Sequence, residues 1–270
     1  MAADVRDQEA IARCFAHVTP SVVFHLAAQT LVATSSSDPL RDAQINVLGT
    51  VNVIQAAIAA GTRKLVFASS GGTVYGNPLI QPDPETHDLW PISPYGVSKV
   101  AGENYVQVLC GRAGMASTVM RYGNVYGPRD IPASHHVITA FLDALLNGQP
   151  PIIEWDGEQA KDYVYVADVA AANVAAIAAG DGEAFNIASG VEISVNEIFR
   201  LVCQEMEVDV QPLRVERRPA DVRRFMLDCT RADRMLGWTP TTSFADGLRQ
   251  TVRYYRHQGR LRSLRFVPVQ

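Results

Sequence analysis

Length, composition and charge describe an ordinary globular chain. The 270 residues are 47% hydrophobic and 19% charged, enough for a substantial core, and the net charge of −4 argues against a nucleic-acid-binding surface. No apolar run approaches the roughly 18 residues of a membrane span, no signal peptide is visible, and the four cysteines are far apart. We therefore expect free thiols and a cytoplasmic protein that binds neither a membrane nor a nucleic acid.

The first half of the sequence alternates between helical and strand patterns. Asp7 is the expected N-cap of an initial helix with apolar residues at helical spacing, and residues 4–6 are expected to end a strand or form a turn. The elements that follow are a strand at 21–28, a helix at 38–61 closed by Gly61, a strand at 63–70, a helix at 93–114, and a strand that begins at 116 and enters a Gly- and Pro-rich loop by 128. This alternation predicts right-handed βαβ units and a parallel sheet.

The pattern loosens in the second half. We expect a helix at 136–147, two short strands, a helix capped by Asp168, a strand at 184–190, a helix at 194–206, and helical segments near 230–236 and 243–258. Ser194 and Glu197 form a capping box at the start of the helix at 194–206. This part is expected to be a lobe that interleaves with the sheet. The adjacent His135 and His136 would point about 100° apart on a helix, which makes them a poor metal pair.

The stretch SPYGVSK places Tyr95 and Lys99 four residues apart, on one face of a helix. A neighbouring ammonium lowers the pKa of a phenol from its free value of about 10, so that the phenol can act as a general acid or base near neutral pH. The alternative is a half-buried Tyr beside a solvated Lys. The preceding FASSGGTVYG brings Ser69, Ser70 and Thr73 to the carboxyl edge of the sheet, where ligands bind, unless these residues only form turns.

Seven ordered motifs resemble the extended short-chain dehydrogenase/reductase superfamily, and most of all its NAD-dependent nucleotide-sugar epimerases of the UDP-glucose 4-epimerase type. They are HLAAQ (25–29), NVLGT (46–50), FASSGGTVYG (67–76), SPYGVSK (93–99), RYGNVYGPR (121–129), DGEQAKDYVYVADVA (156–170) and LGWTP (236–240). The resemblance implies an α/β fold, a Rossmann-like doubly wound parallel sheet with a smaller interleaved α+β substrate lobe. The NAD-binding domain would span 1–128 and about 160–190, and the nucleotide-sugar-binding lobe 129–159 and 191–270.

The resemblance also implies a mechanism, the 4-epimerisation of a UDP-hexose such as UDP-glucose through a 4-keto intermediate. Tyr95 would take the proton of the sugar 4-hydroxyl while a hydride passes to tightly held NAD. Lys99 would bind the nicotinamide ribose and depress the pKa of Tyr95. Ser70, or as second choice Thr73, would share the proton of the substrate oxygen, although many relatives carry a hydroxyl at the position of Gly71.

Further positions follow from the same resemblance. The cofactor-binding set comprises Leu26, Ala27, Ala28 and Gln29 beside the pyrophosphate and nicotinamide ribose, Asn46, Gly123 beside the nicotinamide, and Asp4 and Val5 against the adenine. The substrate-binding set comprises Asn124 and Lys161 at the phosphates, and Arg218 and Asp221 at the diphosphate and uridine ribose. Lys161 stands where the family usually has Arg, and it keeps the charge without the bidentate fork. A solvated surface face is the alternative for the basic cluster around Arg218.

One substitution separates two reactions of the superfamily. Its sugar 4,6-dehydratases carry an Asp-Glu pair where this chain has Gly72 and Thr73, which favours an epimerase. The alternatives are a related dehydratase or reductase, or a non-catalytic nucleotide-sugar-binding remnant.

The Gly-rich turn that a dinucleotide fold of this type requires is missing from the sequence. Neither G-x-G-x-x-G nor G-x-x-G-x-x-G occurs, so by the family pattern we expect a first βαβαβ segment of roughly 60 residues to be lacking. Strand 21–28 would then lie at an edge of the sheet. The family pattern also implies a homodimer that pairs helices 38–60 and 95–112 of two chains.

Overall fold

The protein is described by a computed structural model that covers residues 2–77, 81–131, 136–216 and 222–257. Its main sheet contains four parallel strands in the order β1-β2-β3-β7. They are β1 (Val22–His25), β2 (Lys64–Ser70), β3 (Ala116–Tyr122) and β7 (Glu183–Ile187). The order confirms the predicted parallel sheet and places β1 at the edge of the described sheet, as expected for strand 21–28.

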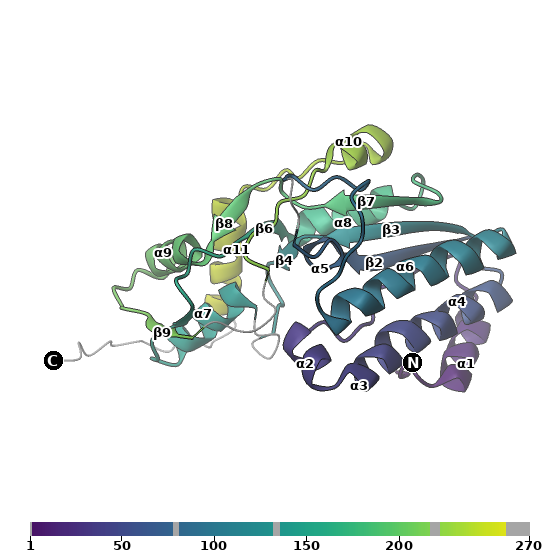
Figure 1. Cartoon of the computed structure of the whole chain (residues 1–270), viewed down its shortest axis with the longest axis horizontal. Coiled ribbons are helices and arrows are strands. Elements are labelled where there is room, and N and C mark those ends of the chain that lie inside the picture. Colours follow the sequence, from purple (N-terminus) through teal and green to yellow (C-terminus); the bar gives the residue numbers. More distant parts are fainter. Residues whose placement is uncertain (1, 78–80, 132–135, 217–221, 258–270) are drawn as a thin grey trace.

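Helices cover both faces of this sheet, because the side chains of a strand alternate between the two faces. Leu65 and Phe67 of β2 pack against α1 (Gln8–Val18), α4 (Gly49–Ala59) and α6 (Pro94–Ala113). Val66, between them, packs on the other face against α8 (Val166–Ala175) and α10 (Thr230–Leu236). Figure 1 shows the two layers, with α1, α4 and α6 on one side of the sheet and α8 and α10 on the other. The fold is therefore a doubly wound α/β sheet.

A second lobe packs around its own core. It contains α7 (Val137–Leu146), β5 (Ile152–Glu154), β8 (Glu192–Ser194), α9 (Val195–Met206), β9 (Leu213–Val215) and α11 (Phe244–Tyr255). The short strand β4 (Asn124–Tyr126) pairs in parallel with β6 (Ala160–Tyr165), and β6 pairs antiparallel with β8. The chain thus leaves the main sheet after β3, returns for α8 and β7, and leaves again, which is the predicted interleaving (Figure 1). No helix within the described ranges is long and apolar enough to cross a membrane.

The predicted caps are confirmed where their partners are close in sequence. The carboxylate of Asp7 accepts a hydrogen bond of 2.9 Å from the backbone N–H of Ala10, three residues on. The hydroxyl of Ser93 accepts in the same way from Gly96, and that of Ser194 from Glu197. Gly61 closes the α4 helix in the left-handed region, with φ +69°.

The structure adds detail to the expected elements. The helix expected at 38–61 is helical throughout 39–59, but a π-helical turn η1 (Gln44–Leu48) lies between α3 (Pro39–Ala43) and α4, and a further short helix, α2 (Val32–Ser37), precedes it. The strand that begins at 116 ends at Tyr122, and β4 belongs to the second sheet. The short helix α5 (Gly71–Val74) follows β2.

The expectation that Asp168 caps a helix is wrong. The N-cap of α8 is Tyr165, and Asp168 lies inside the first turn. Its carboxylate accepts hydrogen bonds from the backbone N–H groups of Thr241 and Thr242, at 3.2 and 3.1 Å. Asp168 therefore fastens the C-terminal part of the chain to α8, a contact between residues 73 positions apart.

Candidate active site

The carboxyl ends of the main strands meet the start of helix α6, which carries Tyr95 and Lys99. The loop after β1, the helix α5 after β2 and the residues after β3 all lie at this edge, because parallel strands end on the same side. Both Tyr95 and Lys99 are buried, with 7% and 4% of their surface exposed. The sequence motifs that were far apart in the chain are therefore brought to one edge of the sheet.

Tyr95 forms a hydrogen bond with the side chain of Ser70, and its backbone N–H donates to Ser35 Oγ at 3.1 Å. Burial raises the pKa of Tyr95 to about 12, the hydrogen bond with Ser70 lowers it, and the charge of Asp42 raises it further. The expectation that Lys99 depresses this pKa is therefore wrong for the structure as it stands. The cost of burying a phenolate outweighs any attraction to the ammonium, so Tyr95 is protonated at neutral pH.

Lys99 is held under the Tyr95 ring. Its Nζ lies 5.7 Å from the centroid of that ring and 5.1 Å from that of Phe67, and it donates a hydrogen bond of 2.9 Å to the carbonyl of Ala68. Burial lowers the pKa of Lys99 to about 8, while the carboxylates of Asp42 and Glu103 raise it. Lys99 is therefore mainly an ammonium at pH 7, and it loses its proton just above physiological pH.

The three candidate hydroxyls have different surroundings. Ser70 bonds to Tyr95, as described above. The hydroxyl of Thr73 donates to the Ser70 carbonyl at 3.4 Å, within the first turn of α5. Ser69 points to the other face of β2 and donates to Glu103 at 2.5 Å. This arrangement favours Ser70 over Thr73 as the partner of Tyr95.

The loop after β1 combines exposed and anchored residues. Leu26 and Ala27 are exposed, and Ala28 is half-buried. Gln29 and the buried Asn46 bond reciprocally: the Gln29 N–H donates to Asn46 Oδ1 at 2.9 Å, and Asn46 Nδ2 donates to the Gln29 carbonyl at 2.8 Å. Residues 26–28 thus present backbone and small side chains to a ligand, whereas Gln29 and Asn46 hold the loop in place.

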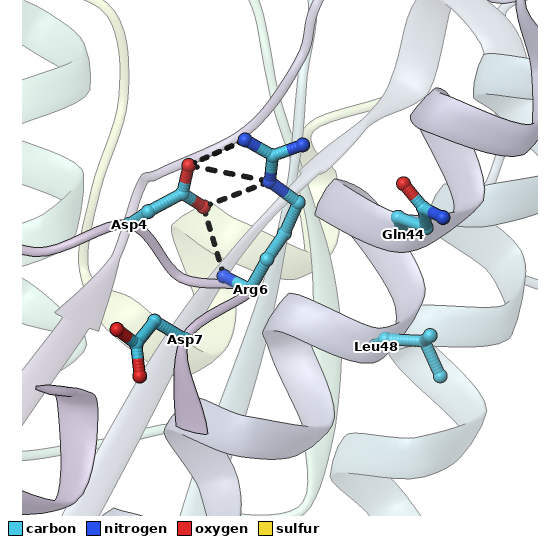
Figure 2. A pocket seen from close by; sticks show the side chains of 5 residues that line it. All are labelled: Asp4, Arg6, Asp7, Gln44 and Leu48. Carbon is cyan, nitrogen blue, oxygen red and sulfur yellow. Dashed lines mark hydrogen bonds and ion pairs between the residues drawn. The ribbon is translucent and has the colours of Figure 1, made fainter. Parts of the chain in front are cut away.

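The predicted adenine contacts, Asp4 and Val5, lie before helix α1. Figure 2 shows an open pocket lined by Asp4, Arg6, Asp7, Gln44 and Leu48, in which Asp4 pairs with Arg6 at 2.7 Å. Val5 faces α4 instead: a Cβ on Gly49 would lie 2.6 Å from Val5 Cγ2. Of the two residues, only Asp4 lines the pocket.

The predicted cofactor residue Gly123 and the predicted substrate residues Asn124 and Lys161 lie where the chain passes from β3 into the second lobe. Gly123 has no room for a side chain, since a Cβ would be 2.9 Å from the Asp162 carbonyl. Asn124 is half-buried in β4, and the Lys161 ammonium lies 5.8 Å from the centroid of the Phe225 ring. Arg218 and Asp221 lie outside the described residues.

Four residues near the site were not identified from the sequence. Glu103 and Arg121 form a buried ion pair at 2.7 Å between α6 and β3. Phe225 and Leu227 cover α5: a Cβ on Gly71 would lie 2.4 Å from Leu227 Cδ1, and one on Gly72 would lie 2.9 Å from Phe225 Cζ. The Gly71–Gly72 pair was the one signal in the sequence, since it indicates close packing, but it could not show which residues pack there.

A family model described as GDP-mannose 4,6 dehydratase matches residues 1–251 of the chain. The chain belongs to this family. The relatives of the chain include nucleotide-sugar epimerases and dehydratases. The chain therefore belongs to the NAD-dependent epimerase/dehydratase branch of the extended short-chain dehydrogenases/reductases, as the motifs indicated.

Relatives within this family carry out both reactions. The UDP-glucose 4-epimerase of Mycolicibacterium smegmatis is 40% identical over 95% of the chain and 82% of its own length. The mouse dTDP-D-glucose 4,6-dehydratase is 31% identical, over 94% of the chain and 72% of its own length.

Solved structures of epimerases share the fold. The UDP-glucose 4-epimerase of Thermotoga maritima, whose crystal structure contains UDP-glucose, superposes with a TM-score of 0.93 at 41% identity. The match covers 95% of the present chain and 84% of the Thermotoga chain. The Thermus thermophilus UDP-glucose 4-epimerase, in complex with NAD, gives 0.88 at 35% identity, covering 94% and 83%. The Rossmann-like fold predicted from the motifs is therefore confirmed.

Replacing each candidate hydroxyl tests the assignment of Ser70. In an assay of UDP-glucose/UDP-galactose interconversion with NAD present, we expect Ser70→Ala to lower kcat about 100-fold. Thr73→Ala should change kcat by less than about threefold. Because the bond from Ser70 lowers the pKa of Tyr95, its loss should also move the pH–rate profile toward alkaline pH. Steady-state kinetics across pH measures both effects, and a larger loss in Thr73→Ala would reverse the assignment.

Proposed function

We propose that the protein is an NAD-dependent nucleotide-sugar epimerase that inverts C4 of a UDP-hexose of the UDP-glucose/UDP-galactose type. The observation that carries this proposal is the buried Tyr95–Ser70 pair, one helical turn from Lys99, at the carboxyl edge of a parallel sheet. Such a group can exchange a proton with a ligand oxygen in a site from which water is excluded.

Tyr95 and Ser70 handle the proton of the sugar 4-oxygen. When the alcohol is oxidised to the 4-ketone, Tyr95 takes the hydroxyl proton, and when the ketone is reduced, Tyr95 returns it. Because its pKa is raised, Tyr95 carries a proton at neutral pH, so it has one to return in the second direction. In the first direction, Tyr95 acts as the phenolate, and the Ser70 hydroxyl is the neighbouring group that favours this form.

The cofactor-side residues fit NAD, whose nicotinamide would accept the hydride from C4 and return it to the opposite face. Residues 26–28 line the edge where the nicotinamide ribose would lie, and the Lys99 ammonium is a donor for its hydroxyls. The Thermus relative in complex with NAD supports this choice of cofactor.

The packing of α5 supports epimerisation over dehydration. Expelling water from a sugar requires an acid and a base next to the strand that carries Ser70, and this chain has Gly72 and Thr73 there. Phe225, only 3% exposed, fills the space that a side chain at Gly72 would occupy. The site therefore offers a proton-transfer group at one sugar oxygen and no carboxyl pair at positions 72 and 73.

Two features support a UDP-sugar as substrate. Asn124 begins β4, and Lys161 lies in β6, the strand that pairs with β4 on the lobe side, where the diphosphate would lie. The Thermotoga relative, whose structure contains UDP-glucose, supports the uridine nucleotide and the hexose. We assign Arg218 and Asp221 to the diphosphate and ribose on the family pattern.

We also propose a cytoplasmic homodimer that pairs α4 and α6 of two chains. The two helices pack side by side (Figure 1), and Val97 and Val108 of α6 are more than half exposed, which suits an apolar contact between subunits. Light scattering on the purified chain should give twice the mass of 29.4 kDa, and a monomer would contradict the pairing.

Substitution of the catalytic Tyr tests the proposed function. We expect Tyr95→Phe to lower the rate of UDP-glucose/UDP-galactose interconversion about 10²–10⁴-fold with a small change in KM, because only the proton transfer is lost. Tyr105→Phe is the matched control, a Tyr on the same helix that is 43% exposed. Full activity in Tyr95→Phe would refute the assignment.

A further inference from the structure

Asp42 is a buried carboxylate to which neither the motifs nor the proposed chemistry assigns a role. It lies in α3 and is 1% exposed. Its Oδ1 accepts hydrogen bonds from Gln29 Nε2 at 2.8 Å and from Asn46 Nδ2 at 3.0 Å, and its Oδ2 accepts one from Ser98 Oγ at 2.6 Å. These donors come from the loop after β1, the π-helical turn η1 and the catalytic helix α6.

The three donors join the cofactor side of the site to its catalytic side. Gln29 and Asn46 hold the loop of residues 26–29, as described above. Ser98 lies between Tyr95 and Lys99 along α6 and directly precedes Lys99. One carboxylate therefore fixes the distance between the loop and the helix that would together contact the cofactor.

All three hydrogen-bond donors to Asp42 are neutral side chains. A buried carboxylate is costly without an opposite charge nearby. The groups that face the Lys99 ammonium are Asp42 from α3, Glu103 and Tyr95 from α6, and His25 from β1.

Asp42 differs from the other groups around Lys99. Glu103 is held by the Arg121 guanidinium through Nε and Nη2, so its charge is largely neutralised. His25 is uncharged at neutral pH, because burial and, to a smaller extent, the charge of Lys99 together lower its pKa to about 4. Tyr95 is protonated. Asp42 differs from Glu103 because its hydrogen bonds come from the neutral side chains of Gln29, Asn46 and Ser98 and not from a guanidinium.

We propose that Asp42 is a positioning residue that clamps the loop after β1 to α6 and keeps Lys99 in its ammonium form. Its consequence for catalysis rests on the proposed function, in which the ammonium binds the cofactor ribose. Its consequence for Lys99 itself does not.

Asp42→Asn separates charge from shape. The new side chain has the same size, and its carbonyl can still accept from Gln29 and Asn46 while its NH2 donates to the Ser98 hydroxyl, which can act as donor or acceptor. We therefore expect a folded protein in which the pKa of Lys99 falls from about 8 to about 7. Since activity requires the ammonium, the alkaline limb of the pH–rate profile should move to lower pH by the same amount.

The titration of Lys99 can be measured without turnover. The sequence has three lysines, Lys64, Lys99 and Lys161, so ¹³C-lysine labelling gives three Cε signals, and Lys99→Arg assigns one of them. In Asp42→Asn, we expect the proton dissociation constant of Lys99 to rise about tenfold, so its signal should titrate at lower pH. The titrations of the other two signals should be unchanged. This result stands or fails independently of the reaction, so it is distinguishable from failure of the proposed function.

Ser98→Ala is the matched control, because it cuts the link to α6 and keeps the charge. We expect its Tm to fall by about 2–4 °C and the Lys99 titration to stay as in the parent chain. An unchanged Lys99 titration in Asp42→Asn would overturn the proposal, as would an equal fall in Ser98→Ala. Failure of Asp42→Asn to fold would also overturn it, since the carboxylate would then serve the fold and not Lys99.

Discussion

The ion pair between Glu103 and Arg121 fixes the position of the catalytic helix on the sheet. Glu103 lies one turn after Lys99 in α6, and the Arg121 guanidinium in β3 binds its carboxylate through two nitrogens. Arg121 also donates to the hydroxyl of Tyr75 at 2.9 Å and to the carbonyl of Glu85 at 3.3 Å. Both partners of the pair are about 6% exposed, and removing one partner of such a buried pair typically costs about 3–5 kcal/mol. The places of Tyr95 and Lys99 therefore depend on a charge pair beneath them.

Burial acts on the two catalytic groups in opposite senses. It disfavours the charged form of each, so it raises the pKa of Tyr95 to about 12 and lowers that of Lys99 to about 8. The pair is thus closer to neutral than two solvated side chains would be. The polar groups around it, Ser70 at the phenol and the carboxylates near the ammonium, shift the balance back toward the ionised forms. At neutral pH, Tyr95 therefore carries its proton, and the phenolate, once formed, is a stronger base than that of a solvated tyrosine.

Local signals in the sequence predicted the fold well. Caps such as Ser93 and Ser194 bond to groups three residues away, and the strands near 63–70 and 116–122 are apolar runs that the sheet buries. The motifs also indicated the family and the edge of the sheet at which Tyr95 and Ser70 meet. What failed involved partners distant in sequence. Asp168 resembles a helix cap until Thr241 and Thr242 are placed against it, and the Glu103–Arg121 pair depends on how α6 lies over β3.

The same limit applies to the catalytic pair and to the glycines. The sequence placed Tyr95 and Lys99 on one helix face, but their pKa shifts depend on burial that a linear pattern does not show. It identified Gly72 as a departure from the dehydratase pattern and Gly71 as a position where many relatives carry a hydroxyl. Phe225 and Leu227, which fill the space above these glycines, come from more than 150 residues later.

The most direct test of the account is the product formed from UDP-galactose. The purified chain would be incubated with UDP-galactose and NAD and followed by ¹H NMR. The account predicts that the anomeric signal of UDP-glucose appears until both sugars reach equilibrium, with no methyl signal of a 4-keto-6-deoxy sugar. A 4-keto-6-deoxy product, or no conversion under conditions in which NAD is bound, would contradict it.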